Sequence, residues 1–125
     1  MTTWTGDELN RVGKAEELQI ESLRRDGTLR KPVIIWMVRV DDEIFIRCVN
    51  GRAGMWFRHA QTCHAGHIRA GGVEKDVSFV EVTDPGINER VDAAYRTKYA
   101  RYPQYVAPLF KPESREATLK LLPRD

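Results

Sequence analysis

Three arginines and all three histidines of the 125-residue chain fall within residues 47–67, RCVNGRAGMWFRHAQTCHAGH. Cys48 and Cys63 lie in the same segment. Side chains of these types bind anions or metal ions, so the segment raises two chemical hypotheses. A third interpretation, an ordinary corner between a strand and a helix, requires no ligand.

The anion hypothesis rests on the bend NGRAG at residues 50–54. Gly51 and Gly54 allow the backbone to approach a ligand closely, and Arg52 lies between them. A helix expected over residues 55–63 would add free backbone amides and the positive end of its dipole. The pattern predicts a phosphate cradle, although such turns are common and this one matches neither the triphosphate loop nor the dinucleotide fingerprint.

The metal hypothesis rests on His59 and Cys63, which are four residues apart and therefore share one face of the expected helix. His64 and His67 follow closely. Their spacing does not match a zinc finger or a metalloprotease helix, and the run contains no acidic residue. We therefore predict no metal site. His59 has two further interpretations, a proton donor that titrates near neutral pH or a structural histidine bonded to a carbonyl.

A β-hairpin is predicted over residues 32–49, PVIIWMVRVDDEIFIRCV, with its turn at the Asp–Asp pair. This register places Val38 opposite Phe45 and Trp36 opposite Arg47. Both faces of the hairpin are apolar, so both should be covered, as happens in a barrel whose outer face is covered by helices or by a second subunit. Arg47 on a covered face requires a partner. The partner is a protein carboxylate, the Trp36 ring or a bound anion, and the sequence leaves these three open.

The other segments are predicted to contain strands interrupted by helices, without the strand-helix-strand alternation of a doubly wound nucleotide fold. A capping box at Thr5 and Glu8 begins a first helix, and Asp84 with Pro85 begins a long one. The stripe expected to be buried on the long helix consists of Ile87, Val91, Ala94, Tyr95 and Lys98. The remaining expectations are a strand over 17–24, a hairpin over 66–82 turning at its Gly–Gly pair, an irregular segment after residue 103 and a last strand over 116–122.

Composition limits the class of protein. One domain is expected over residues 1–125, with 42% hydrophobic and 30% charged residues. A net charge of only +2 gives no strong attraction to nucleic acid or membrane. Two cysteines are too few for a disulfide scaffold, and the N-terminal segment does not resemble a signal peptide. We expect a cytoplasmic protein with reduced thiols that binds neither nucleic acid nor membrane.

The run TLRKPVIIWMVRVDDEIFIRCVNGRAGMWFRHA and the later GHIRAGG resemble the pyridoxamine-phosphate-oxidase-like split β-barrel flavoproteins. The deazaflavin-dependent nitroreductase branch looks most similar. The shared arrangement is a basic residue before the first hairpin strand, the hairpin, a glycine–arginine bend and a helix that opens with an aromatic pair. With AYRTKY and ATLKLLP, the whole chain looks like a small bacterial family of unknown function in that superfamily. The implied fold is mainly β with helices, a split β-barrel of the FMN-binding type.

The resemblance also implies a homodimer that holds FMN or a deazaflavin in a cleft between subunits. It implies a flavin- or deazaflavin-dependent oxidoreductase whose cofactor phosphate is bound by basic and hydroxyl side chains. The residues nominated in this way are Arg30, Lys31, Arg47, Gly51, Arg52 and Gly54, followed by Trp56 and Arg58.

The hydroxyl side chains are where the sequence departs from this pattern. Flavin-binding members usually carry serine or threonine at the end of the second strand and in the bend, where this chain has Cys48, Val49, Gly51 and Ala53. A second hypothesis is therefore a non-catalytic dimeric binding protein that has lost the flavin site.

Overall fold

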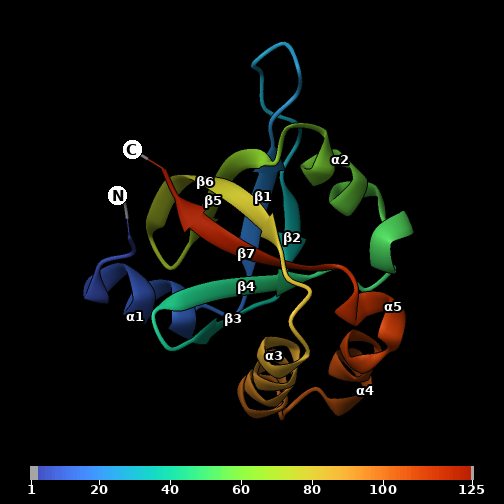
Figure 1. Ribbon diagram of the computed structural model, residues 1–125. Coiled ribbons are helices and arrows are strands. Elements are labelled where there is room, and N and C mark those ends of the chain that lie inside the picture. Colours follow the sequence, from blue (N-terminus) through green and yellow to red (C-terminus); the bar gives the residue numbers. More distant parts are fainter. Residues whose placement is uncertain (1–2, 125) are drawn as a thin grey trace.

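In the computed structural model, which describes residues 3–124, one antiparallel sheet of seven strands forms the body of the protein. The strands lie in the order β2-β1-β5-β6-β7-β4-β3 and curl into a nearly closed barrel (Figure 1). The predicted mainly β barrel with inserted helices is confirmed. The strands are β1 (Leu18–Ser22), β2 (Val33–Ile35), β3 (Met37–Val40), β4 (Glu43–Arg47), β5 (Ala65–Ala70), β6 (Val73–Glu81) and β7 (Thr118–Pro123).

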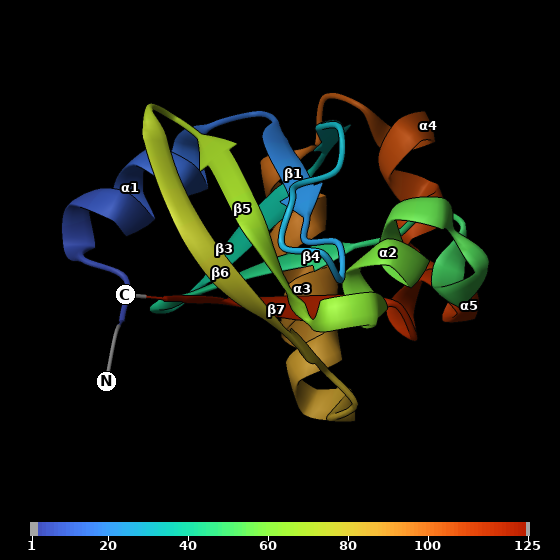
Figure 2. The ribbon, with the colours of Figure 1, turned by 90° about the horizontal axis from the view of Figure 1, so that it is seen from above.

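Helices flank the barrel, with α1 at one end and α4 and α5 at the other (Figure 2). The predicted caps are confirmed, since Thr5 forms a capping box with Glu8 and Asp84 accepts bonds from the first turn of α3. The segment after Pro103 is helical rather than irregular, because prolines occupy first-turn positions that lack a donor requirement. The helices are α1 (Gly6–Lys14), α2 (Met55–Cys63), α3 (Pro85–Lys98), α4 (Pro103–Val106) and α5 (Pro112–Arg115), with 3₁₀ turns η1 (Gly51–Ala53) and η2 (Ala107–Phe110).

Both predicted hairpins are present. Val38 pairs with Phe45 across β3 and β4, as the hairpin register requires. β5 and β6 turn at Gly71 and Gly72, whose φ angles of 59° and 82° are positive. Positive φ at both turn positions strains a residue with a Cβ, which explains the glycine pair.

The first hairpin strand breaks at Trp36, a feature the sequence analysis missed. β2 pairs with β1, whereas β3 pairs with β4 from Met37 opposite Ile46 onward. Trp36 belongs to neither ladder, so the predicted pairing of Trp36 with Arg47 is wrong. Arg47 instead lies opposite Thr118 of β7. The change of partner lets one segment supply both edge strands of the sheet.

Hydrophobic side chains pack on both sides of the β3–β4 hairpin, as predicted. The barrel interior holds Met37, Ile44, Ile46 and Phe57 among others. A second cluster fills the space between the hairpin and α3, which covers its outer face, and contains Val38, Phe45, Val91, Tyr95 and Tyr99. Among residues 3–124, no helix is both long and apolar enough to cross a membrane.

Candidate functional site

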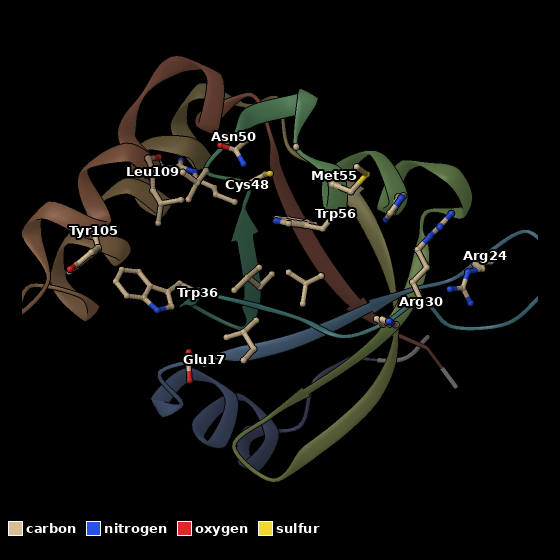
Figure 3. A pocket seen from close by; sticks show the side chains of 18 residues that line it. Glu17, Arg24, Arg30, Trp36, Cys48, Asn50, Met55, Trp56, Tyr105 and Leu109 are labelled. Carbon is tan, nitrogen blue, oxygen red and sulfur yellow. Dashed lines mark hydrogen bonds between the residues drawn. The ribbon is translucent and has the colours of Figure 1, made fainter.

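A cavity of about 700 Å³ opens beside the strand break. Its walls come from β2, the end of β4, the first turn of α2, the η2 segment and the connection between β1 and β2. Figure 3 shows Arg24 and Arg30 at one end and Trp36 and Tyr105 at the other. The cavity therefore has a cationic end and an aromatic, apolar end, and its size is typical of a small-molecule site.

Four basic side chains form the cationic end: Arg24, Arg30, Lys31 and His59. No carboxylate within residues 3–124 forms an ion pair with either arginine or with the lysine. The Nε of Arg30 is buried and has no hydrogen-bond partner in that part of the chain. A buried donor without a partner is costly, so this end of the cavity is suited to an anion.

The connection between β1 and β2, which we call the cationic arm (residues 23–32), holds the basic side chains in place. It projects from the barrel (Figure 1) and is closed by a bridge between Leu23 and Leu29. At its tip Asp26 accepts bonds from the Thr28 amide (2.9 Å) and hydroxyl (2.6 Å). Arg24 donates to the Leu29 carbonyl at 3.0 Å. These local bonds give the arm a defined shape.

The aromatic end is built around Trp36. Its ring stacks on Tyr99, with ring centroids 4.0 Å apart and an interplanar angle of 4°, so its orientation is fixed from behind. Tyr105 (70% exposed) and Ile34 (58% exposed) complete the rim. Among the lining residues that the structure describes, Glu17 is the single acid. This end offers planar apolar surface to a ligand.

The positive charges of the cationic end act on His59. Burial and the neighbouring Arg30, Arg58 and Arg24 together lower the pKa of His59 below its ordinary value. His59 is therefore a neutral imidazole at neutral pH. The surrounding arginines therefore disfavour a further positive charge at this position, on the ring or beside it.

Gly54 is at the cavity wall for a packing reason. A Cβ at this position would lie 2.2 Å from the Sγ of Cys48, so only glycine leaves room for the sulfur. Cys48 is 2% exposed, and burial raises the pKa of its thiol. The thiol is thus protonated and packed rather than reactive.

Arg47 reaches the back of the cavity, but every guanidinium N–H already has an acceptor. Nε donates to Thr118 Oγ1 (2.9 Å), and Nη1 donates to the Leu109 carbonyl (3.0 Å) and to Asp92 Oδ1. Nη2 donates to the carbonyl and side-chain oxygens of Asn88, both at 2.9 Å. Five donors and five acceptors leave none for a ligand.

The partner of Arg47 is thus a protein carboxylate, one of the three alternatives left open by the sequence. Its aromatic neighbour is Tyr95, whose ring centroid is 5.8 Å from the guanidinium carbon, rather than Trp36. Burial lowers the pKa of Arg47, while the hydrogen bond and charge of Asp92 oppose that effect. Arg47 fixes the η2 wall of the cavity through the Leu109 carbonyl.

Arg30, Lys31, Arg47, Gly54 and Trp56 of the predicted site line the cavity. Three further nominated residues do not: Gly51, Arg52 and Arg58. Arg52 donates to Glu81 Oε1 at 2.7 Å and lowers the pKa of that carboxyl. Gly51 has a φ of 69°, and a Cβ there would lie 2.9 Å from the Glu113 carbonyl.

Sequence reasoning missed Arg24 and the two residues of α3 that accept hydrogen bonds from Arg47. Asn88 and Asp92 are four residues apart and interleave with Val91 and Tyr95 on the buried face of α3. Two polar residues within an apolar helical stripe were the signal for a buried polar partner. Arg24 carried no comparable signal, because a loop residue has no periodicity that fixes its direction.

The residues of the metal hypothesis do not assemble into a site. Within residues 3–124, no three His, Cys, Asp or Glu side chains are grouped to hold a metal ion. His67 lies 2.9 Å from Asp76 Oδ1 and 3.1 Å from Glu74 Oε1. Burial lowers the pKa of His67, but the bonds to these two carboxylates outweigh it and raise the pKa above its ordinary value.

The fold is the pyridoxamine-phosphate-oxidase-like split β-barrel, as a comparison with solved structures shows. A conserved hypothetical protein from Mycobacterium tuberculosis matches with a TM-score of 0.72 and 11% identity, over 100% of this chain and 83% of that chain. An FAD-binding protein from Mesorhizobium loti matches with a TM-score of 0.62 and 13% identity, over 99% and 93%. An F420-H2 dependent reductase matches with a TM-score of 0.62 and 10% identity, over 85% and 93%.

Within this fold the chain belongs to the family DUF2255, described as uncharacterized proteins conserved in bacteria, whose model matches residues 8–121. The predicted resemblance to the split-barrel superfamily is confirmed. No curated protein matches the sequence. At these identities the structural likeness shows the fold, and function must be argued from the cavity.

Proposed function

We propose that the chain binds a flavin or deazaflavin and acts as an oxidoreductase that uses this cofactor. The single observation that carries the proposal is the buried, unpartnered Nε of Arg30 at the cationic end of a cavity with aromatic walls. A phosphate would satisfy that donor, and Trp36 and Trp56 would flank a planar ring. The names of the FAD-binding and F420-H2 dependent neighbours support this class of ligand.

The residues present fit such a cofactor. Arg30, Lys31 and Arg24 supply three positive charges, which suits one or more phosphate groups. When bound, the cofactor supplies the hydride chemistry. The chain's own contribution is to bind the phosphate, to orient the ring against Trp36 and to exclude water with the apolar rim. This replaces the predicted cradle at Arg52 with one on the cationic arm.

A second subunit would cover the rim of the cavity, as in the cleft of a homodimer. Val33, Ile34, Val49, Met55 and Tyr105 line the cavity and remain 39–70% exposed in the single chain. A cluster of exposed apolar side chains around a ligand site is typical of an interface. We expect light scattering to give twice the chain mass of 14.4 kDa, and a mass near 14.4 kDa would contradict the dimer.

A cofactor-free binding protein is the second candidate, and the cavity's composition favours it. Among the described residues that line the cavity, none is serine or threonine. Phosphate binding would then rely on arginine, lysine and backbone amides alone. The same cavity would serve a different anionic, partly aromatic ligand.

Quenching of tryptophan fluorescence distinguishes the two candidates. Trp36 and Trp56 line the cavity, whereas Trp4 is buried elsewhere and bonded to the Leu121 carbonyl. Titration with FMN and, separately, with a deazaflavin should give saturable quenching by one of them. Trp4→Phe should preserve the response and Trp56→Phe should reduce it. No response to either compound would leave the cofactor-free binding protein.

A further inference from the structure

His59 lies at the cationic end of the cavity, and no carboxylate within residues 3–124 forms an ion pair with it. It is half-buried on α2 and faces Arg24 and Arg30 of the cationic arm, with Arg58 beside it on its own helix. Among residues 3–124, these three arginines are the charged groups that lower the pKa of the ring. Glu17, the acid among the described lining residues, lies away from Arg24 and Arg30 in Figure 3.

This surrounding keeps the ring neutral. Burial and three positive charges disfavour a fourth charge, which is why the pKa of His59 is lowered. A neutral imidazole has one donor and one acceptor nitrogen, whereas the imidazolium has two donors. An anion placed beside Arg30 and Arg24 would offset their charge and favour the imidazolium.

We propose that the cationic end of the cavity binds an oxyanion together with a proton, and that His59 takes up this proton. The ligand class is a phosphate ester or another tetrahedral oxyanion, held by Arg30 and by the protonated ring. The location of the anion rests on the proposed function, but the proton uptake is a property of this chain's own residues. In this proposal His59 does more than line the cavity wall: it binds the ligand and favours ligands that carry negative charge.

The direction of the linkage follows from the two states of His59. In the free protein the imidazole binds a proton only at low pH, and in the complex it keeps the proton to higher pH. Between these two limits the complex holds more protons than the free protein, so the affinity for the anion rises as the pH falls. Above both limits the affinity becomes independent of His59.

Sulfate is a suitable probe, because its charge stays constant between about pH 5 and pH 8, unlike that of a phosphate ester whose second pKa is about 6. The ring resonances of the histidines are followed by NMR against pH, in sulfate and in chloride of equal ionic strength. We expect the titration midpoint of His59 to move to higher pH in sulfate. His67, held by Asp76 and Glu74, is the internal control and should not move.

Two variants sharpen the experiment. Arg30→Met should raise the midpoint of His59 in chloride and abolish its response to sulfate, while Arg52→Met should change neither. Sulfate affinity of the unaltered protein should be about tenfold higher near pH 5.5 than near pH 8, and His59→Gln should remove this difference.

An unmoved His59 midpoint, or an equal movement of His67, would overturn the inference even if FMN binds. Conversely, a sulfate-dependent His59 midpoint in a protein that binds neither FMN nor deazaflavin would support the inference and remove the proposed cofactor.

Discussion

Two arginines reach the same cavity, and their surroundings are opposite. Arg47 has a side chain that is 0% exposed, pairs with Asp92 and satisfies all five of its donors within the protein. Arg30 lies on the cationic arm with a buried Nε that lacks a partner within residues 3–124. The sequence nominated both for the same role.

Donor satisfaction, rather than burial or position, distinguishes the structural Arg47 from Arg30, the arginine proposed above to bind the anion. Arg47 stabilises the contact between β4, β7, α3 and η2, because breaking one of its hydrogen bonds would leave a buried polar group without a partner. Arg30 lacks a partner for its Nε within residues 3–124, so this donor is left for the proposed anion. Four substitutions test this comparison, in order of decreasing effect.

Arg47→Met should cause the largest change. Removing the guanidinium leaves the carboxylate of Asp92 without its closest partner, and a broken buried ion pair costs about 3–5 kcal/mol. Urea unfolding followed by circular dichroism should show this loss in the free energy of unfolding. The double variant with Asp92→Asn should lose less than the sum of the single losses. A cost below about 1 kcal/mol would remove the distinction between the two arginines.

Arg30→Met should weaken ligand binding and leave folding intact. Loss of a charge-assisted bond, typically about 1.5–3 kcal/mol, predicts a decrease of more than about tenfold in the affinity for FMN or deazaflavin. The free energy of unfolding should stay within about 0.5 kcal/mol. Fluorescence titration measures the first quantity and urea unfolding the second. Unchanged affinity would exclude Arg30 from the site.

Thr118→Val should produce an intermediate effect on stability. The hydroxyl of Thr118 is the acceptor for Arg47 Nε, and valine has nearly the same shape. Leaving the buried Nε–H of Arg47 without an acceptor should lower the free energy of unfolding by about 1–3 kcal/mol, measured by thermal unfolding. Thr118→Ser keeps the hydroxyl and is the matched control. Equal stability of the valine variant and the native protein would mean that Arg47 tolerates an unsatisfied donor.

Arg52→Ala should have the smallest effect. Its ion pair with Glu81 is half exposed on the arginine side, and such pairs contribute at most about 1 kcal/mol. Since the side chain lies outside the cavity, the affinity for FMN should not change. A more than tenfold loss of affinity would restore the bend as the phosphate cradle and would count against the cationic arm.

Much of the fold could be predicted from the sequence, because local patterns determine it. Alternation of apolar residues and the Asp–Asp turn predicted the register of β3 and β4. The Gly–Gly pair predicted the β5–β6 turn, where both glycines have positive φ. The break at Trp36 could not be predicted in this way. The run PVIIWMVRV alternates through the break, and the change of pairing partner depends on β1 and β4, which contact it from different directions.

The site was less predictable, because a list of basic residues does not reveal their partners. Arg47 and Arg52 are close in sequence to the expected anion site. In the fold, however, Arg47 pairs with Asp92 and Arg52 pairs with Glu81, both distant in the chain. Arg30 and Lys31 were nominated through the family resemblance and do line the cavity. The titrations above measure whether they bind a ligand.

The place of β7 in the sheet has a consequence for how the protein is made. β7 is the last strand in sequence, yet it lies between β6 and β4 and pairs with both. Strands β1 to β6 are synthesised before β7, so the facing edges of β6 and β4 stay unpaired on the nascent chain. Because unpaired edges promote aggregation, the gap between β6 and β4 is a point of risk until β7 (Thr118–Pro123) is available to fill it.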